Sequence, residues 1–204
     1  MDAAEAADQV RETAEERVHE AQEAREHFRS RAALVIALVA AVLAICELGG
    51  DDAKNRMLNN NIRASDAWSF YQAKNLRQTE YKLAADELKR SLAAPGLASE
   101  ARALAQADLA KYEKTAARYE DDPHGDGKKQ LQARAKGFEE ARDVAGERNE
   151  FFDYAQMLLQ LAVVLGSVSI LALSRPLLWV SGVLGAAGLA LVVNGFLLLA
   201  PMPH

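Results

Sequence analysis

The sequence lacks the residue patterns by which most enzymes and nucleic-acid-binding proteins are recognised. Cys46 is the only cysteine, so no disulfide can form within the chain. The four histidines are scattered over polar segments, and no catalytic triad, zinc-protease motif or glycine-rich phosphate loop is present. Acidic and basic residues are interspersed at a net charge of -5, unlike the basic patch of a nucleic-acid-binding protein. We expect a protein that is not an enzyme, with no catalytic residue, no cofactor and no nucleic-acid partner.

Strand patterns and proline are also scarce, and both absences favour long helices. The polar segments are rich in Ala, Glu, Lys, Arg and Leu, with little of the Val-Ile-Thr alternation that is typical of β-strands. The chain contains only five prolines. The central polar segment is interrupted at A-A-P-G-L (Ala93–Leu97) and at D-D-P-H-G-D-G (Asp121–Gly127). These features predict an all-α protein.

Three apolar blocks stand out against this polar background. They cover 32–46, 154–173 and 177–200. A helix needs about 20 mostly apolar residues to cross a bilayer, and an open sheet is not stable in lipid. The second and third blocks meet this length, and the first reaches it with Glu47 and Leu48, because the Glu47 carboxylate can extend to the membrane surface. The sequence therefore predicts an all-α membrane protein with transmembrane helices at 31–50, 154–174 and 177–200.

The distribution of positive charge predicts the orientation of these helices. Three arginines between Arg25 and Arg31 precede the first span, and Arg175 lies in the short turn between the second and third spans. In a three-span protein both sites lie on one side of the membrane, which the positive-inside rule assigns to the cytoplasm. The segment 1–30 is then a cytoplasmic polar helix, either self-associating through a thin apolar stripe or solvated. The segment 51–153 lies outside.

The segment 51–153 is predicted to form a long helical hairpin, or coiled-coil domain, between the first and second spans. In its first arm, apolar residues recur at helical spacing between Tyr81 and Leu92. This arm rises roughly 60 Å as a helix, and the later helices, at 98–121 and 128–153, together nearly match that height. We expect both later helices to return toward the membrane. The last is expected to continue without interruption into the second span.

Three aromatic residues lie close together in the first arm, in S-D-A-W-S-F-Y-Q-A-K (Ser65–Lys74). Trp68, Phe70 and Tyr71 cannot all share one helix face, because residues one and two apart point in different directions. A two-helix hairpin buries one face of each helix. The second face therefore predicts contact with another copy of the chain or with a different protein. The alternative is that one aromatic is exposed or packs on a neighbouring helix, as single surface aromatics often do.

The aromatic stretch and the C-terminal spans together resemble a known family. S-D-A-W-S-F-Y-Q-A-K follows a first span and an acidic, amide-rich linker. After the apolar segment 158–173 come the arginine-bearing turn, W-V-S-G-V-L-G-A-A-G (179–188) and V-N-G-F (193–196). In these features the chain is similar to the bacterial membrane proteins of domain-of-unknown-function family 4337, from about residue 31 onward. The resemblance implies three spans and a bacterial membrane, and it implies no activity and no site residues. With the charge argument, it predicts an inner-membrane protein with a periplasmic central domain.

Polar residues in or beside the apolar blocks are the other candidates for a site. Glu47, Asp51 and Asp52 follow the first span and would form an acidic ring in an oligomer, as in a cation pore, or would lie individually at the membrane surface. Gln160 and Asn194 are expected at similar depth in adjacent antiparallel helices, so each is a candidate partner for the other. Alternatively, one of these amides points to the first span or to a neighbouring copy.

The expected function is structural rather than catalytic. We predict a homo-oligomeric scaffold, or an accessory subunit of a membrane complex, whose partners are the lipid bilayer, copies of itself or another membrane protein complex. The alternative is a small oligomeric ion channel or transporter subunit with an acidic outer mouth. A conducting path requires polar residues that recur along a span, whereas here they lie at one depth, which favours the scaffold. The turn at 121–126 has neither the spacing of a calcium loop nor a second histidine, so no metal site is predicted.

Overall fold

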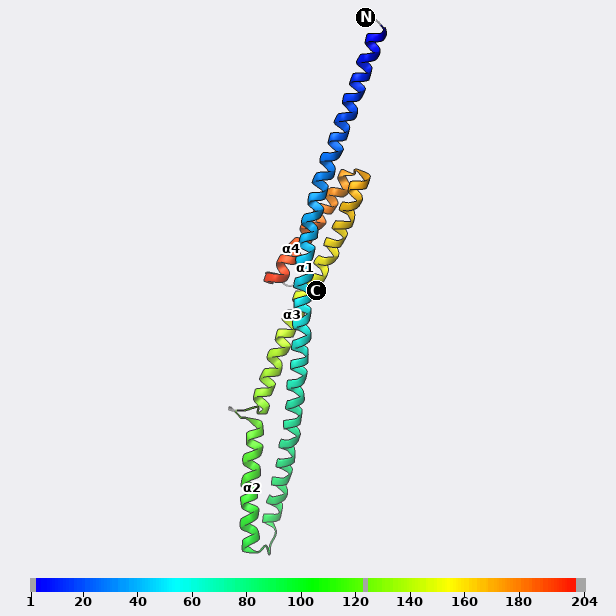
Figure 1. Ribbon diagram of the computed structural model, residues 1–204. Coiled ribbons are helices and arrows are strands. Elements are labelled where there is room, and N and C mark those ends of the chain that lie inside the picture. Colours follow the sequence, from blue (N-terminus) through cyan, green and yellow to red (C-terminus); the bar gives the residue numbers. More distant parts are fainter. Residues whose placement is uncertain (1–2, 123–124, 201–204) are drawn as a thin grey trace. The chain divides into compact units, whose positions relative to one another are not determined.

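The computed structural model describes residues 3–122 and 125–200, with side chains from residue 15 onward. Helix is the only regular structure in these residues (Figure 1). The four helices are α1 (Ala3–Ala93), α2 (Ser99–Glu120), α3 (Lys128–Ala172) and α4 (Arg175–Leu197). The prediction of an all-α protein is confirmed.

The chain divides into two compact units. The three-helix unit contains α1 as far as Lys54, α3 from Gly146 onward, and α4. The hairpin unit covers Asn55–Ala145 and contains the second half of α1, the whole of α2 and the first part of α3. Each unit has its own buried side chains and is described separately below.

The helix ends follow the prolines and glycines of the sequence. α1 ends at Ala93, and the turn that follows contains Gly96 with φ of 92°, a left-handed conformation that glycine adopts without steric cost. α2 ends at Glu120, and α3 begins at Lys128 after the second predicted break. The next proline is Pro176, in the first turn of α4, and α3 is continuous over its 45 residues. Both predicted breaks and the uninterrupted third helix are confirmed.

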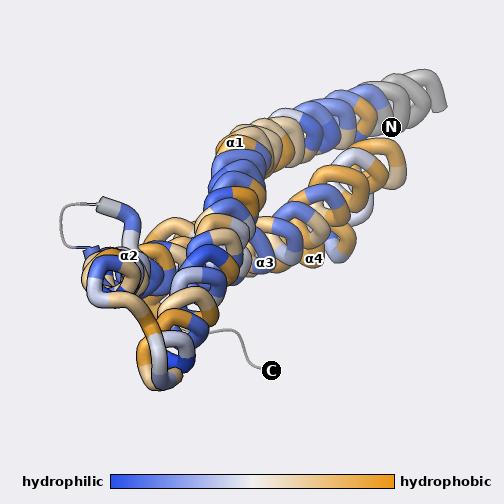
Figure 2. The backbone as a smooth tube through the Cα atoms, turned by 90° about the horizontal axis from the view of Figure 1, so that it is seen from below, coloured by the Kyte–Doolittle hydropathy of each residue, from blue (hydrophilic) through white to orange (hydrophobic). Residues whose placement is uncertain are grey.

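The segment after the first apolar block is helical, whereas the sequence indicates a linker. α1 continues through Gly49, Gly50 and the acidic residues that follow. A Cβ atom on Gly49 would lie 2.7 Å from the ring of Phe152, so this glycine provides room for an aromatic ring against the helix. A glycine within a helix costs only about 1 kcal/mol, which neighbouring helix-forming residues and packing offset. In Figure 2, α1 passes from a hydrophilic stretch into a hydrophobic one and back to a hydrophilic one.

The hairpin unit is held together by hydrogen bonds and ion pairs between α1 and the two later helices, spaced along the length of α1. Cross-helix bonds join Lys89 to Glu113, Gln78 to Glu120, Trp68 to Glu139, and Asn61 to Arg142. Positions on α1 decrease as positions on α2 and α3 increase, so both later helices run antiparallel to α1. The prediction that both return along the first arm is confirmed. The apolar spacing between Tyr81 and Leu92 marks the inner face of α1, on which Ala85 is fully buried.

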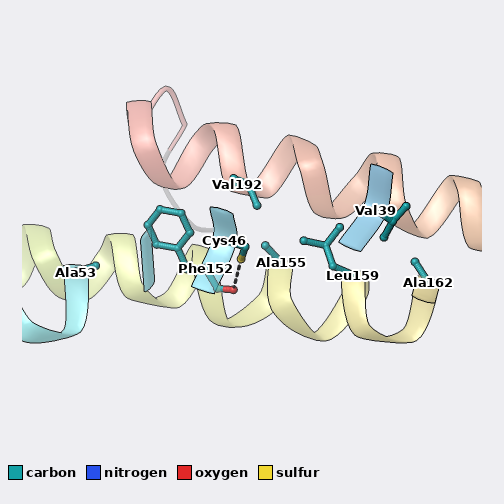
Figure 3. Close-up of a cluster of buried hydrophobic side chains, with 8 residues drawn as sticks. All are labelled: Val39, Cys46, Ala53, Phe152, Ala155, Leu159, Ala162 and Val192. Carbon is teal, nitrogen blue, oxygen red and sulfur yellow. Dashed lines mark hydrogen bonds between the residues drawn. The ribbon is translucent and has the colours of Figure 1, made fainter. Parts of the chain in front are cut away.

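The three-helix unit has an apolar core in which small residues allow the helices to approach closely. Eight buried residues form this core: Val39, Cys46, Ala53, Phe152, Ala155, Leu159, Ala162 and Val192 (Figure 3). Cys46 Sγ lies 3.4 Å from the Phe152 carbonyl oxygen, to which it donates. Added Cβ atoms on Gly185 and Gly188 would lie within 3 Å of Val39 and Leu159, respectively. These contacts are of the small-residue type that packs helices in membranes.

All three helices that contribute to this unit are long and apolar enough to cross a membrane. Their outward faces carry large apolar side chains, among them Leu171 at 85% and Trp179 at 76% exposure. Exposed apolar side chains around a packed core are the arrangement expected of helices whose surroundings are lipid.

Candidate functional site

The three aromatic residues of the first arm lie on different faces of α1. Trp68 and Tyr71 are on the inner face, with their rings edge to face at a centroid distance of 5.5 Å. Trp68 Nε1 donates to Glu139 Oε1 of α3 at 2.8 Å. Phe70 lies on another face and is 63% exposed. Two of the three aromatics therefore stabilise the hairpin unit itself, and only Phe70 is available to a partner.

A buried polar cluster lies where α1 meets the break between α2 and α3. Gln78, Glu120 and Lys128 form this cluster, which we name the polar latch. Lys128 Nζ donates to Gln78 Oε1 at 2.8 Å and to Glu120 Oε2 at 3.1 Å. Gln78 Nε2 donates to the same carboxylate oxygen and to the Ala116 carbonyl oxygen, both at 2.9 Å. Gln78 and Lys128 are buried, and these bonds satisfy groups that would otherwise be costly to bury.

The electrostatics of the polar latch favour the charged form of the carboxylate. The pKa of Glu120 is lowered, first by the hydrogen bond from Gln78 and then by that from Lys128. Lys128 Nζ also lies 5.5 Å from the centre of the Tyr71 ring, a cation–π contact. Lys128 is the first residue of α3, an end at which a positive charge is unfavourable, so the Glu120 carboxylate offsets its charge.

Sequence reasoning missed the polar latch, although one signal for it exists. Tyr71, Gln78 and Ala85 recur every seven residues, and Ala85 belongs to the predicted inner face. A glutamine in that series is a polar residue at a core position, and such a residue needs buried partners. Those partners lie 38 to 50 residues away along the chain, in segments that the sequence alone does not bring together.

Tyrosines form a second group in the hairpin unit, nearer its turn. The Tyr81 ring stacks on Tyr119 with a centroid distance of 5.8 Å and lies 5.6 Å from Tyr112. These rings line an open groove of about 620 Å³ that also contains Arg77 and Lys111. Tyr81 belongs to the apolar spacing identified in the sequence, and its partners on α2 explain its position on the inner face.

The polar residues of the apolar helices do not converge on one site. Glu47 and Gln160 are exposed on α1 and α3, respectively. Asn194 Nδ2 donates to the Ala200 carbonyl oxygen at 2.9 Å, and the Ala200 N–H donates back to Asn194 Oδ1 at 3.0 Å. The predicted pairing of Gln160 with Asn194 is therefore wrong. The physical reason is that α4 ends at Leu197, short of the predicted residue 200, and the Asn194 amide caps the chain where it leaves the helix.

The buried hydroxyls of these helices are bound to backbone. Ser181 Oγ of α4 donates to the Ala162 carbonyl oxygen of α3 at 2.6 Å, and Ser169 Oγ donates to the Gly166 carbonyl oxygen within α3. The first bond links two helices directly, at a point where Ser181 is fully buried. Neither hydrogen bond was predicted from the sequence.

The acidic turn after α2 is occupied by ion pairs and amide bonds within the chain. Asp121 accepts from Lys129 and Gln130, and Asp126 accepts from Arg134. Over 3–122 and 125–200, no group of three or more His, Cys, Asp or Glu side chains is placed to hold a metal ion. His124 lies outside the described residues.

Comparisons with known proteins bear on the family of the chain. No curated protein and no solved structure matches it. The model of one family, described as a domain of unknown function (DUF4337), matches residues 28–198. That range includes the aromatic stretch, both arms of the hairpin, the first two apolar blocks and the third block as far as residue 198, and it confirms the resemblance read from the sequence. The chain therefore belongs to the domain-of-unknown-function family DUF4337.

Proposed function

We propose that the protein is a non-enzymatic membrane scaffold that assembles with copies of itself through its hairpin unit. Its three apolar helices anchor it in the bacterial inner membrane, and the hairpin unit carries the contacts between copies. The proposal combines the three apolar helices with the surface of the hairpin unit.

The observation that carries this proposal is the apolar surface of the hairpin unit. Four large apolar side chains along one face of α1 are between 49% and 62% exposed: Leu58, Ile62, Leu76 and Leu83. Large apolar side chains on the three-helix unit are accounted for by lipid, but these four lie on a helix segment whose other exposed residues are mostly charged or polar. Exposed apolar side chains that share one helix face outside a bilayer are typical of a protein interface.

The arginines indicate the direction in which the chain crosses the membrane. Arg25 to Arg31 precede the first apolar block and Arg175 begins α4, so a cytoplasmic N-terminus and a periplasmic hairpin follow from the positive-inside rule. With Cys46→Ser as background, a membrane-impermeant thiol reagent should label Ser99→Cys and leave Ala21→Cys unlabelled in intact cells. Labelling of Ala21→Cys alone would reverse the orientation.

The channel alternative has less support. Glu47, Asp51 and Asp52 are exposed on α1 after the first apolar block, as a ring of acidic side chains would require. A conducting path also needs polar groups along the spans, whereas Ser169 and Ser181 donate their hydroxyls to backbone carbonyl oxygens. Conduction is therefore not part of the proposal.

The copy number of the purified full-length protein tests the proposed function. Native mass measurement in mild detergent should give two or more chains per particle. The number of chains per particle should stay the same when the detergent concentration is raised far above the protein concentration. This condition separates a specific assembly from chains that share a micelle by chance. A single chain at every protein concentration would overturn the proposal.

A further inference from the structure

The exposed apolar residues of α1 are arranged in a line along the helix. Ile62, Leu76 and Leu83 fall at positions seven or fourteen residues apart, and Leu58 lies one helical turn before Ile62. Their exposures are 49% for Leu58, 58% for Ile62, and 62% for both leucines that follow. The alternating three- and four-residue spacing that joins them defines what we name the outer stripe: Leu58, Ile62, Ser65, Ser69, Gln72, Leu76, Thr79 and Leu83.

The outer stripe lies away from the face by which α1 packs in the hairpin unit. Ala64, Ala67, Gln78 and Ala85 are buried on that inner face, whereas every residue of the outer stripe is exposed. Leu58, Ile62, Leu76 and Leu83 occupy four of the eight positions of a three-four pattern, which is the pattern of a coiled-coil seam. Among the described residues, no helix of the same chain covers them. α1 therefore carries two seams, of which the hairpin fills one.

Two of the four polar residues of the outer stripe, Ser69 and Thr79, are compatible with burial. Ser69 Oγ donates to the Ser65 carbonyl oxygen at 2.9 Å, and Thr79 Oγ1 donates to the Asn75 carbonyl oxygen at 2.9 Å. These two hydroxyl protons are already satisfied by the helix itself, so a covering helix would not leave them without an acceptor. Serine is also small, which allows a second helix to approach closely at the middle of the stripe.

We propose that the outer stripe is the seam of a parallel, in-register coiled coil with α1 of a second copy of this chain. This inference rests on the proposed function, and it specifies which surface joins the copies and how they are aligned. The outer stripe covers Leu58 to Leu83, which rises roughly 39 Å along a helix and provides more than three heptads.

The charges beside the outer stripe select a second copy as its occupant. Acidic residues follow three of the four bulky residues by four positions on one flank: Asp66 after Ile62, Glu80 after Leu76 and Glu87 after Leu83. On the other flank, an amide or a lysine precedes the same three bulky residues by one position: Asn61, Asn75 and Lys82. One flank is thus acidic, and the other carries donors.

A parallel pairing brings these two flanks together. In parallel coiled coils, the residue before one seam position faces the residue five positions later on the partner. This rule places Lys82 opposite Glu87 of the second copy, Asn75 opposite its Glu80, and Asn61 opposite its Asp66. An antiparallel pairing would instead place the acidic flank against itself, which is destabilising.

The membrane independently favours the parallel arrangement. α1 is one continuous helix that contains the first apolar block and, farther along, the outer stripe. Copies inserted in one bilayer by the same charge rule carry their hairpin units on the same side of the membrane, where the outer stripes of two copies can meet in parallel. A different protein would need an equally matched flank, and it is one of the outcomes that the experiment below can detect.

Cysteine crosslinking tests the alignment directly. With Cys46→Ser as background, Ile62→Cys and Leu83→Cys are each expressed in the full chain and oxidised in membranes before extraction. Identical seam positions face each other only in a parallel, in-register pair, close enough for a disulfide. Both variants should therefore form covalent dimers. An antiparallel pair can bring no more than one of the two positions against itself.

Leu104→Cys is the matched control, because Leu104 is a leucine of the hairpin unit at 64% exposure but lies on α2, outside the outer stripe. It should give at most trace dimer. Crosslinking of only one seam position, or of Leu104→Cys as strongly as both, would overturn the parallel seam. A crosslink to a different protein alone would also overturn it.

Native mass distinguishes this inference from the proposed function. An oligomer by native mass without crosslinks at the seam positions contradicts this inference alone, whereas a monomer by native mass contradicts the proposed function as well.

Discussion

Lys128 Nζ lies 3.1 Å from Glu120 Oε2, across the break that separates α2 from α3. Gln78 on α1 bonds to both side chains, so the end of one helix, the start of the next and the middle of α1 meet in a single cluster. The polar latch therefore closes the interruption in the returning arm. It holds α2 and α3 against the face of α1 opposite the outer stripe.

Loss of the buried lysine should weaken the hairpin unit. Lys128→Met keeps the apolar stem but leaves the buried Gln78 Oε1 without its donor and removes the ion pair with Glu120, which keeps only the bond from Gln78. An unsatisfied buried group costs about 1–3 kcal/mol, so the full-length variant should unfold at lower temperature and exchange amide hydrogens faster around the break. Lys129→Met removes an exposed pair with Asp121 and should leave the unfolding temperature close to that of wild type. Equal effects of the two variants would contradict the role of the polar latch.

The polar latch should also make the hairpin unit sensitive to acid. Because the pKa of Glu120 is lower in the folded protein than in the unfolded chain, its charged form stabilises the fold. This contribution is complete above the ordinary carboxyl pKa of about 4.3 and is lost as the pH falls through the lowered value. Glu120→Gln should unfold at lower temperature than wild type at pH 7, and the difference should shrink toward pH 3. A constant difference across this range would disprove the linkage.

Two glycines in helices should respond oppositely to alanine. A Cβ atom on Gly49 would meet the rings of Phe152 and Phe196 at 2.7 to 2.9 Å, and the Phe152 ring is buried. Gly49→Ala should therefore destabilise by about 1–3 kcal/mol. Nothing lies within 4 Å of a Cβ atom on Gly137, so Gly137→Ala should stabilise by about 0.4–1 kcal/mol. Thermal unfolding in detergent measures both, and a stabilising Gly49→Ala would show that this packing is wrong.

The two amides of α3 and α4 should act independently. Asn194 bonds to Ala200 in both directions, while Gln160 is exposed on α3. In a double-mutant cycle, the losses for Gln160→Leu and Asn194→Leu should add within about 0.3–0.5 kcal/mol. A larger coupling energy would restore the direct pairing that the sequence predicts and would contradict the cap at Ala200.

Local chemistry made the helix ends and the direction of the arms predictable. Pro95 and the turn at 121–127 interrupt an otherwise helical pattern, because proline removes a backbone donor and glycine favours turns. Matching the lengths of the arms then left only one way for α2 and α3 to run. The three long apolar helices were equally predictable from the sequence, because a run of about 20 apolar residues has few stable environments other than a bilayer.

Contacts between residues far apart in the chain could not be predicted from the sequence. A glycine such as Gly49 can end a helix, or it can make room for an aromatic ring against a helix that continues. Here the ring belongs to Phe152, which lies 103 residues later in the chain, so the sequence around Gly49 does not show which applies. Asn194 can pair across helices or cap its own, and the choice depends on where α4 ends. The outer stripe was also missed. The inner face of the hairpin, which the sequence predicts, accounts for one series of apolar residues on α1. The apolar residues of the outer stripe are recognisable as a second series only in the structure, because there they are exposed.

Counting chains in lipid tests whether the outer stripe holds copies of the chain together in a membrane. The full-length protein with one fluorophore per chain is reconstituted at low density, and its photobleaching steps are counted. Wild type and Leu104→Gln should bleach mostly in two or more steps, whereas Leu76→Gln with Leu83→Gln should bleach mostly in one. The account is contradicted if the double variant bleaches in the same number of steps as wild type.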